Sequence, residues 1–506
     1  MDPKELLTTD RRKLLLTVSL ILTLAAFLRF YNIGWSYSNN GVDEGIMLQR
    51  ALLVSEGYGL YTELPCDQAP MAFYLGALLD GEVVPLRAMS ASLSMLAVAA
   101  CMLAARKLAG DKAMILTGLM LAVDFVFVRE SRLFSLDAMS ASFFAFSILA
   151  LAYYVKGESR LALVVAGLMV GVSTSVKLLG VVPLLGMIAF FAVTWVLDRK
   201  VTRRKAIDLG ILVAVSAVPL GLFALLLGPS DILQGTVFDQ GHREFEPFLK
   251  LSIVAFLGLN IPYVLPLVYA RRQWRCSPET RFLIVIVLVV LAFMIVQPLV
   301  FLHHMVMLSP PLAVLAGVLV ARRIDREKCQ GQPIRARILS EKGIGPGTAF
   351  LVVIVAGLCV SSGFGLYGLA AQEKPTQVYY GEFVASLCGP DDWVVSGDPI
   401  IASYAGVRVP PELANVGYRQ YPDLTLDRIE DAIIGYNVSV VVLCYRLNEF
   451  SELPAFLEAH GYEQVAAQRS SHSQPPASSA ALDLFQEGLG DITVYVRMDV
   501  ASAHGL

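Results

Sequence analysis

Long apolar runs, separated by short charged clusters, make up most of the chain as far as residue 371. The first run, 14–31, follows Arg11, Arg12 and Lys13. At 1.5 Å per residue it extends about 27 Å, enough with its flanks to cross a hydrocarbon core of roughly 30 Å. No small-x-small cleavage site follows it, so we interpret it as an uncleaved anchor. Further spans are predicted at 85–108, 112–128, 137–155, 160–176, 180–197, 206–228, 249–270, 281–300, 304–322 and 347–371.

These runs predict a mainly α-helical polytopic membrane protein with about eleven spans. Residues 71–80 are apolar but too short to cross a bilayer, which indicates an interfacial or re-entrant piece. Composition agrees, because 56% of the 506 residues are hydrophobic and 16% are charged, whereas soluble domains carry about 25% charged residues. The net charge of −3 says little about partners.

Lys and Arg are distributed unevenly between alternate loops. The set that begins with the N-terminus holds 24 of them, and the opposite set holds 8. Basic loops stay cytoplasmic, so we predict a multi-pass protein of the cell membrane with a cytoplasmic N-terminus. An odd number of spans then places the C-terminal part outside the cell.

Residues 372–506 differ in pattern from the rest. Short β-type runs at 393–396, 438–443 and 492–496 alternate with helical patterns at 377–388, 424–435 and 449–460. Such alternation predicts a small extracytoplasmic α/β domain with a mostly parallel sheet, distinct from a membrane domain at 1–371. The stretch 470–481 is predicted to be a loop. No glycine-rich phosphate motif is present, and nothing points to nucleotide or nucleic-acid binding.

Seven scattered cysteines form no C-x-x-C pair, which argues against a zinc ribbon or a redox motif. Cys388 and Cys444 could form a disulfide in an oxidising space, although two unpaired thiols are the favoured interpretation.

Ionisable residues gather on the predicted outer side of the membrane. Such groups are costly at membrane depth and are functional candidates by default. Carboxylates could remove a proton or bind a metal, and cations could hold the phosphate of a lipid-borne substrate. The candidates are Asp43, Glu44, Asp67, Arg129, Arg132, Asp137, Lys177, His303 and His304.

Each candidate also has a structural interpretation. Asp43 and Glu44 could cap the helix predicted at 44–56. Arg129 and Arg132 could extend to lipid headgroups, and Asp137 could only neutralise Arg132. Lys177 could anchor the membrane interface, and His303 and His304 could mark a membrane boundary without function.

Five segments resemble, in order, those of the GT-C glycosyltransferases. The similarity covers roughly 14–371 and is greatest to the branch of protein O-mannosyltransferases and bacterial lipid A aminoarabinose transferases. The segments are LRFYNIGWSYSNNGVDEG (28–45), DQAPMAFYLGALL (67–79), ESRLFSLD (130–137), GVSTSVKLLG (171–180) and HHMVMLSPPLAVLAG (303–317).

The resemblance implies roles for several residues. Asp43 matches the catalytic carboxylate of the family, and Glu44 matches its second acid. The family often has Lys-Pro-Pro where this chain has Gln68, Ala69 and Pro70, so phosphate contact must come from elsewhere, with Arg132, Lys177 or the His303 region as candidates. The tryptophan-rich WWD motif of oligosaccharyltransferases is absent, which disfavours that branch.

The predicted reaction is therefore transfer of a monosaccharide from a polyprenyl (dolichyl) phosphate to an acceptor hydroxyl at the outer face, with inversion and with Asp43 as general base. The acceptor could be a protein, a glycan or a lipid, and membrane lipids surround the enzyme. No cofactor is required, although a divalent cation is compatible with the site. The alternatives are a secondary transporter, which the lack of an internal repeat disfavours, and a non-catalytic scaffold or lipid-binding protein.

Overall fold

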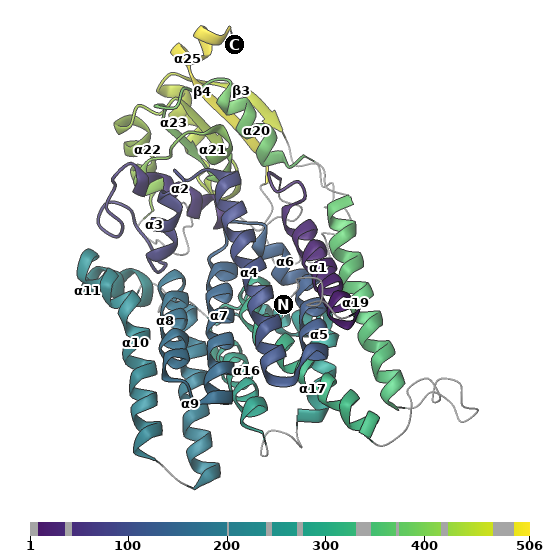
Figure 1. Ribbon diagram of the computed structural model, residues 1–506. Helices are drawn as coiled ribbons and strands as arrows, with labels where there is room; N and C mark the ends of the chain where they lie inside the picture. The colour runs from purple at the N-terminus through teal and green to yellow at the C-terminus, as the bar shows by residue number, and fades with distance from the viewer. Residues whose placement is uncertain are drawn as a thin grey trace, which may run out of the picture.

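The protein is a bundle of long helices with a small mixed sheet at one end (Figure 1). The computed structural model describes residues 9–35, 43–199, 202–238, 245–270, 277–329, 346–370, 374–415, 424–468 and 490–505. The helices of the bundle are α1 (Thr9–Phe30), α4 (Val83–Ala109), α5 (Asp111–Ala122), α6 (Phe125–Ser131), α7 (Leu136–Gly157), α8 (Arg160–Val176), η1 (Leu178–Gly180), α9 (Val181–Asp198), α10 (Arg203–Leu227), α13 (Leu251–Leu259), α14 (Ile261–Val264), η4 (Leu265–Tyr269), α16 (Pro278–Val296), η5 (Leu302–Leu308), α17 (Ser309–Cys329) and α19 (Pro346–Ala370).

Seven of the helical segments in the described residues are long and apolar enough to cross a membrane. They are α1, α4, α7, η1 with α9, α10, α16 and η5 with α17, and each coincides with a predicted span. The shorter apolar helices α8 and 354–370 of α19 lie in two more. The multi-pass helical fold is thus confirmed, while the count of eleven spans stays a prediction.

The span predicted at 112–128 is broken in two. Asp124 caps α6 by accepting a hydrogen bond from the Phe127 N–H at 3.1 Å. Arg29 donates to the last two carbonyls of α5 at 3.2 and 3.3 Å, and the Ser361 hydroxyl donates to the carbonyl of Val123 at 2.6 Å. Backbone groups at membrane depth must be satisfied internally, so these side chains make the break tolerable.

The span predicted at 249–270 is bent by 77° between its two halves. Asn260 ends α13, and its side-chain amide donates back to the carbonyl of Phe256 at 3.1 Å. Pro262 follows in the first turn of the next helix, where its missing N–H costs no helical hydrogen bond.

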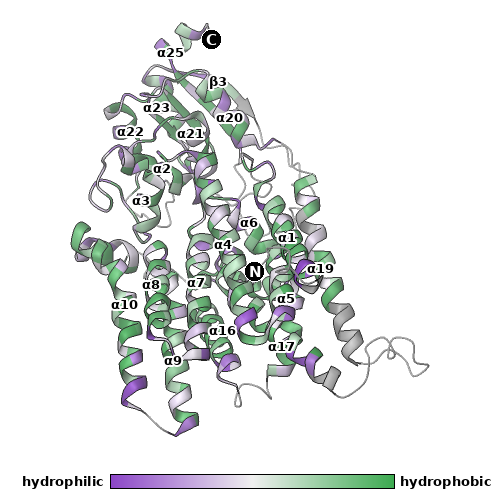
Figure 2. Cartoon of the chain, in the orientation of Figure 1, coloured by the Kyte–Doolittle hydropathy of each residue, from purple (hydrophilic) through white to green (hydrophobic). Residues whose placement is uncertain are grey.

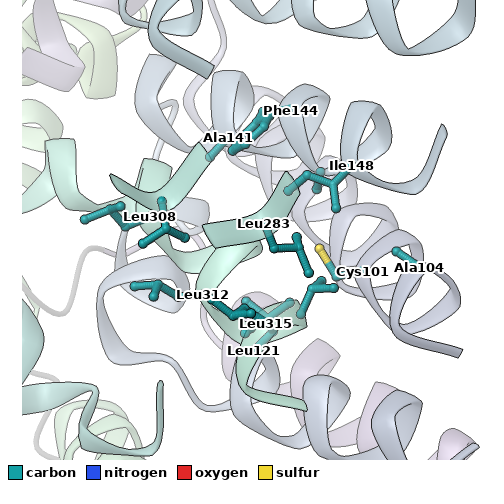
Figure 3. Packing of buried hydrophobic residues seen from close by; sticks show 14 of the residues in the cluster. Cys101, Ala104, Leu121, Ala141, Phe144, Ile148, Leu283, Leu308, Leu312 and Leu315 are labelled. Carbon is teal, nitrogen blue, oxygen red and sulfur yellow. The ribbon is translucent and has the colours of Figure 1, made fainter. Parts of the chain in front are cut away.

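The central helix of the bundle is the segment formed by η5 and α17, whose apolar window is entirely buried. Leu308, Leu312 and Leu315 from this segment pack with Leu283 of α16 and Phe144 of α7 (Figure 3). Removing such a side chain would leave a cavity and cost about 2–5 kcal/mol. The close packing fixes the ends of these helices, where the polar candidates lie.

Polar residues collect at the ends of the membrane helices, whereas their middles are hydrophobic (Figure 2). The end of α9 and the start of α10 lie at the end of the bundle opposite the sheet (Figure 1). They flank one of the basic loops, since α10 begins with Arg203 and Arg204. This basic region therefore lies away from the sheet, while the orientation in the membrane stays a prediction.

The C-terminal sheet has four strands in the order β1-β2-β4-β3. They are β1 (Val394–Ser396), β2 (Val440–Leu443), β3 (Tyr462–Gln468) and β4 (Ile492–Arg497). Only β1 and β2 are parallel, and β4 pairs antiparallel with both β2 and β3. The prediction of a mostly parallel sheet is wrong, because β4 inserts between β2 and the unpredicted β3. The predicted loop at 470–481 lies outside the described residues.

Helices surround this sheet close to where the sequence places them. The three helical patterns correspond to α20 (Thr376–Ala385), α22 (Leu426–Gly435) and α23 (Leu453–Ala459). The remaining elements of the C-terminal part are α21 (Ile400–Ala405), η6 (Pro411–Leu413), η7 (Tyr445–Glu449) and α25 (Met498–His504). Cys388 and Cys444 are both free thiols.

The segment between α1 and α4 packs against the C-terminal part. It contains α2 (Asp43–Ser55) and α3 (Met71–Ala77), which match the predicted helix at 44–56 and the predicted short piece at 71–80. Leu48, Leu53 and Phe73 of this segment share one hydrophobic cluster with Val442 and Val494 of the sheet. The two segments therefore stabilise each other, and the predicted domain boundary at 371 stays a prediction. The elements between α10 and α13 are α11 (Pro229–Leu233), η2 (Gln234–Phe238) and η3 (Pro247–Lys250).

Candidate functional site

The two acids that begin α2 have very different surroundings. Asp43 is the first residue of the helix and is exposed. Glu44 is 5% exposed and forms a bidentate ion pair with Arg87 of α4, with nitrogen–oxygen distances of 2.7 and 2.6 Å. Glu44 also accepts a hydrogen bond from the Phe134 N–H at 2.9 Å. Both carboxylate oxygens of Glu44 are therefore bonded to buried groups, and Asp43 is the acid that solvent or a substrate can reach.

Arg87 connects three segments around the acid pair. Besides Glu44, its guanidinium donates to the carbonyls of Ile33 and Gly34, after α1, at 3.1 and 2.9 Å. It also lies 5.6 Å from the ring centroid of Tyr404 in α21. The arginine guanidinium suits such a junction, because it is planar and permanently charged and can donate to a carboxylate and to carbonyl oxygens at the same time.

The C-terminal part touches α2 directly. A Cβ atom on Gly45 would lie 2.2 Å from the backbone nitrogen of Ile400, so only glycine permits this approach. The Gln49 side chain donates to the carbonyl of Val407 at 3.0 Å and accepts from the Val409 N–H at 3.1 Å. The start of α2 is thus held between α4 on one side and α21 on the other.

A second group of ionisable residues, the outer-turn cluster, consists of Arg129, Glu130, Asp137, Lys177, His303 and His304. Lys177 forms an ion pair with Asp137 at 2.6 Å, and Arg129 approaches Glu130 at 3.7 Å. The Ser135 hydroxyl donates to Glu130 at 2.9 Å. Glu130 lies in the last turn of α6, and the turn that follows carries Ser135 and Phe134, whose N–H contacts Glu44, so this segment connects the cluster to the acid pair.

Three members of the outer-turn cluster could hold a metal ion. One ligand atom from each of Asp137, His303 and His304 lies within 4.8 Å of the other two. Asp137 Oδ1 is buried and accepts no hydrogen bond from the described residues. The Phe301 N–H donates to Nδ1 of His304 at 3.3 Å, so Nε2 would be its ligand atom. Two imidazoles and a carboxylate are a donor set that suits zinc and similar divalent ions.

Asp67 forms a buried ion pair with Arg50 of α2, at 3.1 Å. The side-chain amide of Gln68 donates to the other oxygen of Asp67 at 3.2 Å. Arg50 also lies 5.9 Å from the ring centroid of Phe73. These contacts fasten the loop before α3 to α2, and they give Asp67 a role in positioning this segment.

Arg132 serves the end of α1. Its guanidinium donates to the carbonyls of Leu28, Arg29 and Asn32 at 3.0–3.3 Å. The carbonyls of Leu28 and Arg29 are among those that a helix terminus leaves without an intrahelical partner. With so many donors already bonded to backbone, Arg132 is a weaker candidate for phosphate contact than Lys177.

Several structural interpretations of the candidates are wrong. Arg129 and Arg132 are only 3% and 2% exposed, so neither extends to lipid headgroups. Asp137 pairs with Lys177 and not with Arg132, and this pairing also excludes a purely interfacial role for Lys177.

Two residues of the site were missed at the sequence level. Arg87 appears in the sequence only as a loop cation, and its partner lies 43 residues away. Asp398 lies just before α21, in the part that was interpreted as a separate domain. Neither residue can be identified as part of the site from the sequence, because this requires knowing which segments contact α2.

Residues 67–222 match the sequence profile of a family described as dolichyl-phosphate-mannose-protein mannosyltransferase. None of the curated protein sequences compared with the chain matches it. The fold is that of ArnT from Cupriavidus metallidurans, with a TM-score of 0.65, 16% identity and coverage of 97% of this chain and 99% of that one.

Two further solved structures have the same fold. ArnT from the same organism bound to undecaprenyl phosphate gives a TM-score of 0.60 at 15% identity, over 95% of this chain and 97% of that one. The Archaeoglobus fulgidus oligosaccharyltransferase gives 0.57 at 12% identity, over 93% and 78%. The predicted resemblance is confirmed: by fold and by sequence profile, this chain is similar to the GT-C glycosyltransferases, and the protein O-mannosyltransferase and ArnT branch fits it.

Proposed function

We propose that this protein is a glycosyltransferase that moves a monosaccharide from a polyprenyl (dolichyl) phosphate to an acceptor hydroxyl at the outer face of the membrane. The supporting observation is the division of roles in the acid pair. Glu44 is immobilised by Arg87 and the Phe134 N–H, while Asp43 remains exposed beside it. The fold supports a carrier of this kind, because ArnT has been solved with undecaprenyl phosphate and an archaeal relative in fold with a dolichol phosphate.

Asp43 acts as the general base in this reaction. The acceptor hydroxyl loses its proton to the Asp43 carboxylate, and its oxygen attacks the anomeric carbon from the face opposite the lipid phosphate. The carbon–oxygen bond to the phosphate breaks, the electron pair leaves with the phosphate, and the configuration inverts. General base catalysis typically contributes about 10²–10⁴-fold in rate.

The outer-turn cluster supplies the positive charge for the donor phosphate. Lys177 and Arg129 are its cations, and they occupy the role that a lysine at the position of Gln68 has in related enzymes. Fixed cations stabilise a leaving phosphate most strongly where water is excluded, and Arg129 is 3% exposed.

Asp137, His303 and His304 fit a divalent cation, which would add positive charge at the same place. The Archaeoglobus fulgidus enzyme has been solved with zinc and sulfate. Binding is tested on the purified, chelator-treated protein by metal analysis after equilibration with Zn²⁺. We expect close to one bound ion per chain and its loss in His304→Gln, with His460→Gln as the control for surface imidazoles. Equal binding by all three proteins would contradict this assignment.

The decisive experiment incubates the purified protein with a panel of polyprenyl-phosphate sugars and candidate acceptors, and identifies freed lipid phosphate and product by mass spectrometry. We expect Asp43→Asn to lose at least about 100-fold in kcat, by the general-base contribution above. Asp80→Asn is the matched control, because Asp80 is exposed in the same outer segment.

Two results would overturn the proposal. Full transfer activity in Asp43→Asn would remove Asp43 from the role of base. Uptake of a labelled solute into proteoliposomes without any sugar transfer would identify a transporter instead.

A further inference from the structure

Asp398 is a buried carboxyl at the junction of the C-terminal part with α2. It is 1% exposed. Its Oδ1 accepts a hydrogen bond from the Ile400 N–H at 3.2 Å, and its backbone carbonyl accepts one from the Ser396 hydroxyl at 2.7 Å. Its Oδ2 accepts none from the described residues, although the Gln377 amide is near enough to favour the ionised form. A buried carboxyl oxygen in this state is costly and calls for a reason.

The place of Asp398 brings it next to the acid pair. Pro399 and Ile400 are in contact with Gly45, two residues after Asp43. Burial raises the pKa of Asp398 from 3.8 to about 7, and the charges of Glu44 and Asp43 add to this rise. The electrostatic influence of neighbouring carboxylates is mutual, so an ionised Asp398 also affects Asp43.

Other polar groups near Asp398 do not cancel this influence. Arg87 lies over the ring of Tyr404, and its shortest hydrogen bonds are with Glu44. Tyr404 from α21 and Cys444 after β2 also face Asp398 and are neutral at physiological pH, because burial raises the pKa of both above the usual range. Asp43 and Glu44 on α2 are thus the acids that act on Asp398.

The simplest structural role of Asp398 is to cap α21 through Ile400. That role does not need a charge, because asparagine and serine cap helices as well as aspartate does. Moreover, α21 has only six residues, so a charged cap would bring it little stability.

We propose that Asp398 is a positioning residue for the transfer reaction and acts through Asp43. In its ionised form it increases the proton affinity of the Asp43 carboxylate, and so makes that carboxylate a stronger base toward the acceptor hydroxyl. The C-terminal part thereby completes the site and does not merely cover it. The inference rests on the proposed function, since it assumes that Asp43 removes the acceptor proton.

The test is the dependence of kcat/KM on pH, measured with the full-length enzyme and a sugar donor that supports transfer. Asp398→Asn keeps the cap and removes the charge. We expect kcat/KM at pH 8 to fall roughly three- to tenfold, because the base loses a neighbouring negative charge, and the rise of the wild-type profile near pH 7, where Asp398 ionises, to disappear. Asp398→Glu should retain this rise.

Two further variants complete the test. Asp391→Asn, an exposed acid before β1, is the control for a change of charge in the same part of the chain. Asp398→Ser also retains a capping oxygen, and it replaces the asparagine variant if that variant does not fold. A rise in kcat/KM near pH 7 that persists in these neutral variants would overturn the inference and reduce Asp398 to a helix cap.

The inference and the proposed function fail in different ways. If Asp43→Asn retains transfer, the proposed function fails whatever the pH profile shows. If Asp43→Asn is inactive while Asp398→Asn has the wild-type profile, the proposed function stands and the inference about Asp398 is wrong.

Discussion

Replacing Glu44 by glutamine tests whether the acid pair is fixed by its buried ion pair. The substitution keeps the shape of the side chain and removes its charge. Arg87 is fully buried and would retain only neutral carbonyl acceptors. Breaking a buried ion pair by removing one charge typically costs about 3–5 kcal/mol, and we expect a loss of stability of this size.

The double variant Glu44→Leu with Arg87→Met distinguishes an unpaired charge from a general loss of packing. Hydrophobic replacement of both partners is often far less harmful than removal of one. We therefore expect the double variant to be more stable than Glu44→Gln. Its transfer activity should nevertheless be low, because Asp43 would no longer be held at the end of a fixed helix.

Stability is measured by thermal unfolding in detergent, and limited proteolysis of residues 43–80 shows whether this segment detaches before the bundle unfolds. Glu56→Gln is the matched control, since the ion pair of Glu56 with Arg408 is partly exposed at 3.3 Å and such pairs contribute about 0–1 kcal/mol. If Glu44→Gln is as stable as this control and fully active, the ion pair does not position the site.

Three further predictions concern the surroundings of the acid pair. Gly45→Ala should lower transfer activity about tenfold or more. The new Cβ would collide with the backbone of Ile400, and even a small displacement of a catalytic side chain slows catalysis. Gly210→Ala, with open space around it, should be neutral in the same assay. Arg132→Met should lower the apparent melting temperature, because each buried carbonyl that it leaves unpaired costs about 1–3 kcal/mol. Asp398→Asn should gain stability relative to wild type as pH rises from about 4 to 7. In that range the aspartate of the unfolded wild-type chain ionises, while the pKa of about 7 keeps the folded one protonated, so the wild type loses stability. Thermal unfolding across this pH range measures the difference in stability, and a difference that does not change with pH would contradict the raised pKa.

Hydropathy predicts most of the helical fold because the membrane requires it. A segment that crosses lipid must be long, apolar and hydrogen-bonded within itself, and these demands are visible in any window of sequence. The break between α5 and α6 is invisible to the same reasoning. It depends on Arg29 and Ser361, which come from distant parts of the chain to satisfy its carbonyls.

The sheet shows a similar limit. The buried runs at β1, β2 and β4 are predicted because their side chains are apolar. In contrast, β3 has the sequence YEQVAAQ, which is too polar to be recognised as a strand. It lies at the edge of the sheet, where one side of the strand needs no buried partner. Missing it made the sheet look mostly parallel.

The sequence indicates which residues are candidates for the site more readily than it indicates what each residue does. Asp43, Asp137 and Lys177 are candidates because charged residues are costly near a membrane, but hydropathy does not determine which charges pair. Arg132 was a candidate for phosphate but bonds to the end of α1, whereas Arg87 was overlooked and holds Glu44. The identity of a partner is a property of the fold.

The division between Asp43 and Glu44 follows from the same physics that makes buried charge expensive. Burying a carboxylate without a partner is costly, and Glu44 meets this requirement through its ion pair with Arg87. The adjacent Asp43 is exposed and gains the rigidity of its neighbour. One acid therefore fixes the start of α2 while the next remains available for chemistry. Because α21 closes against the same helix end through Gly45, the geometry of Asp43 depends on the C-terminal part as much as on the membrane bundle.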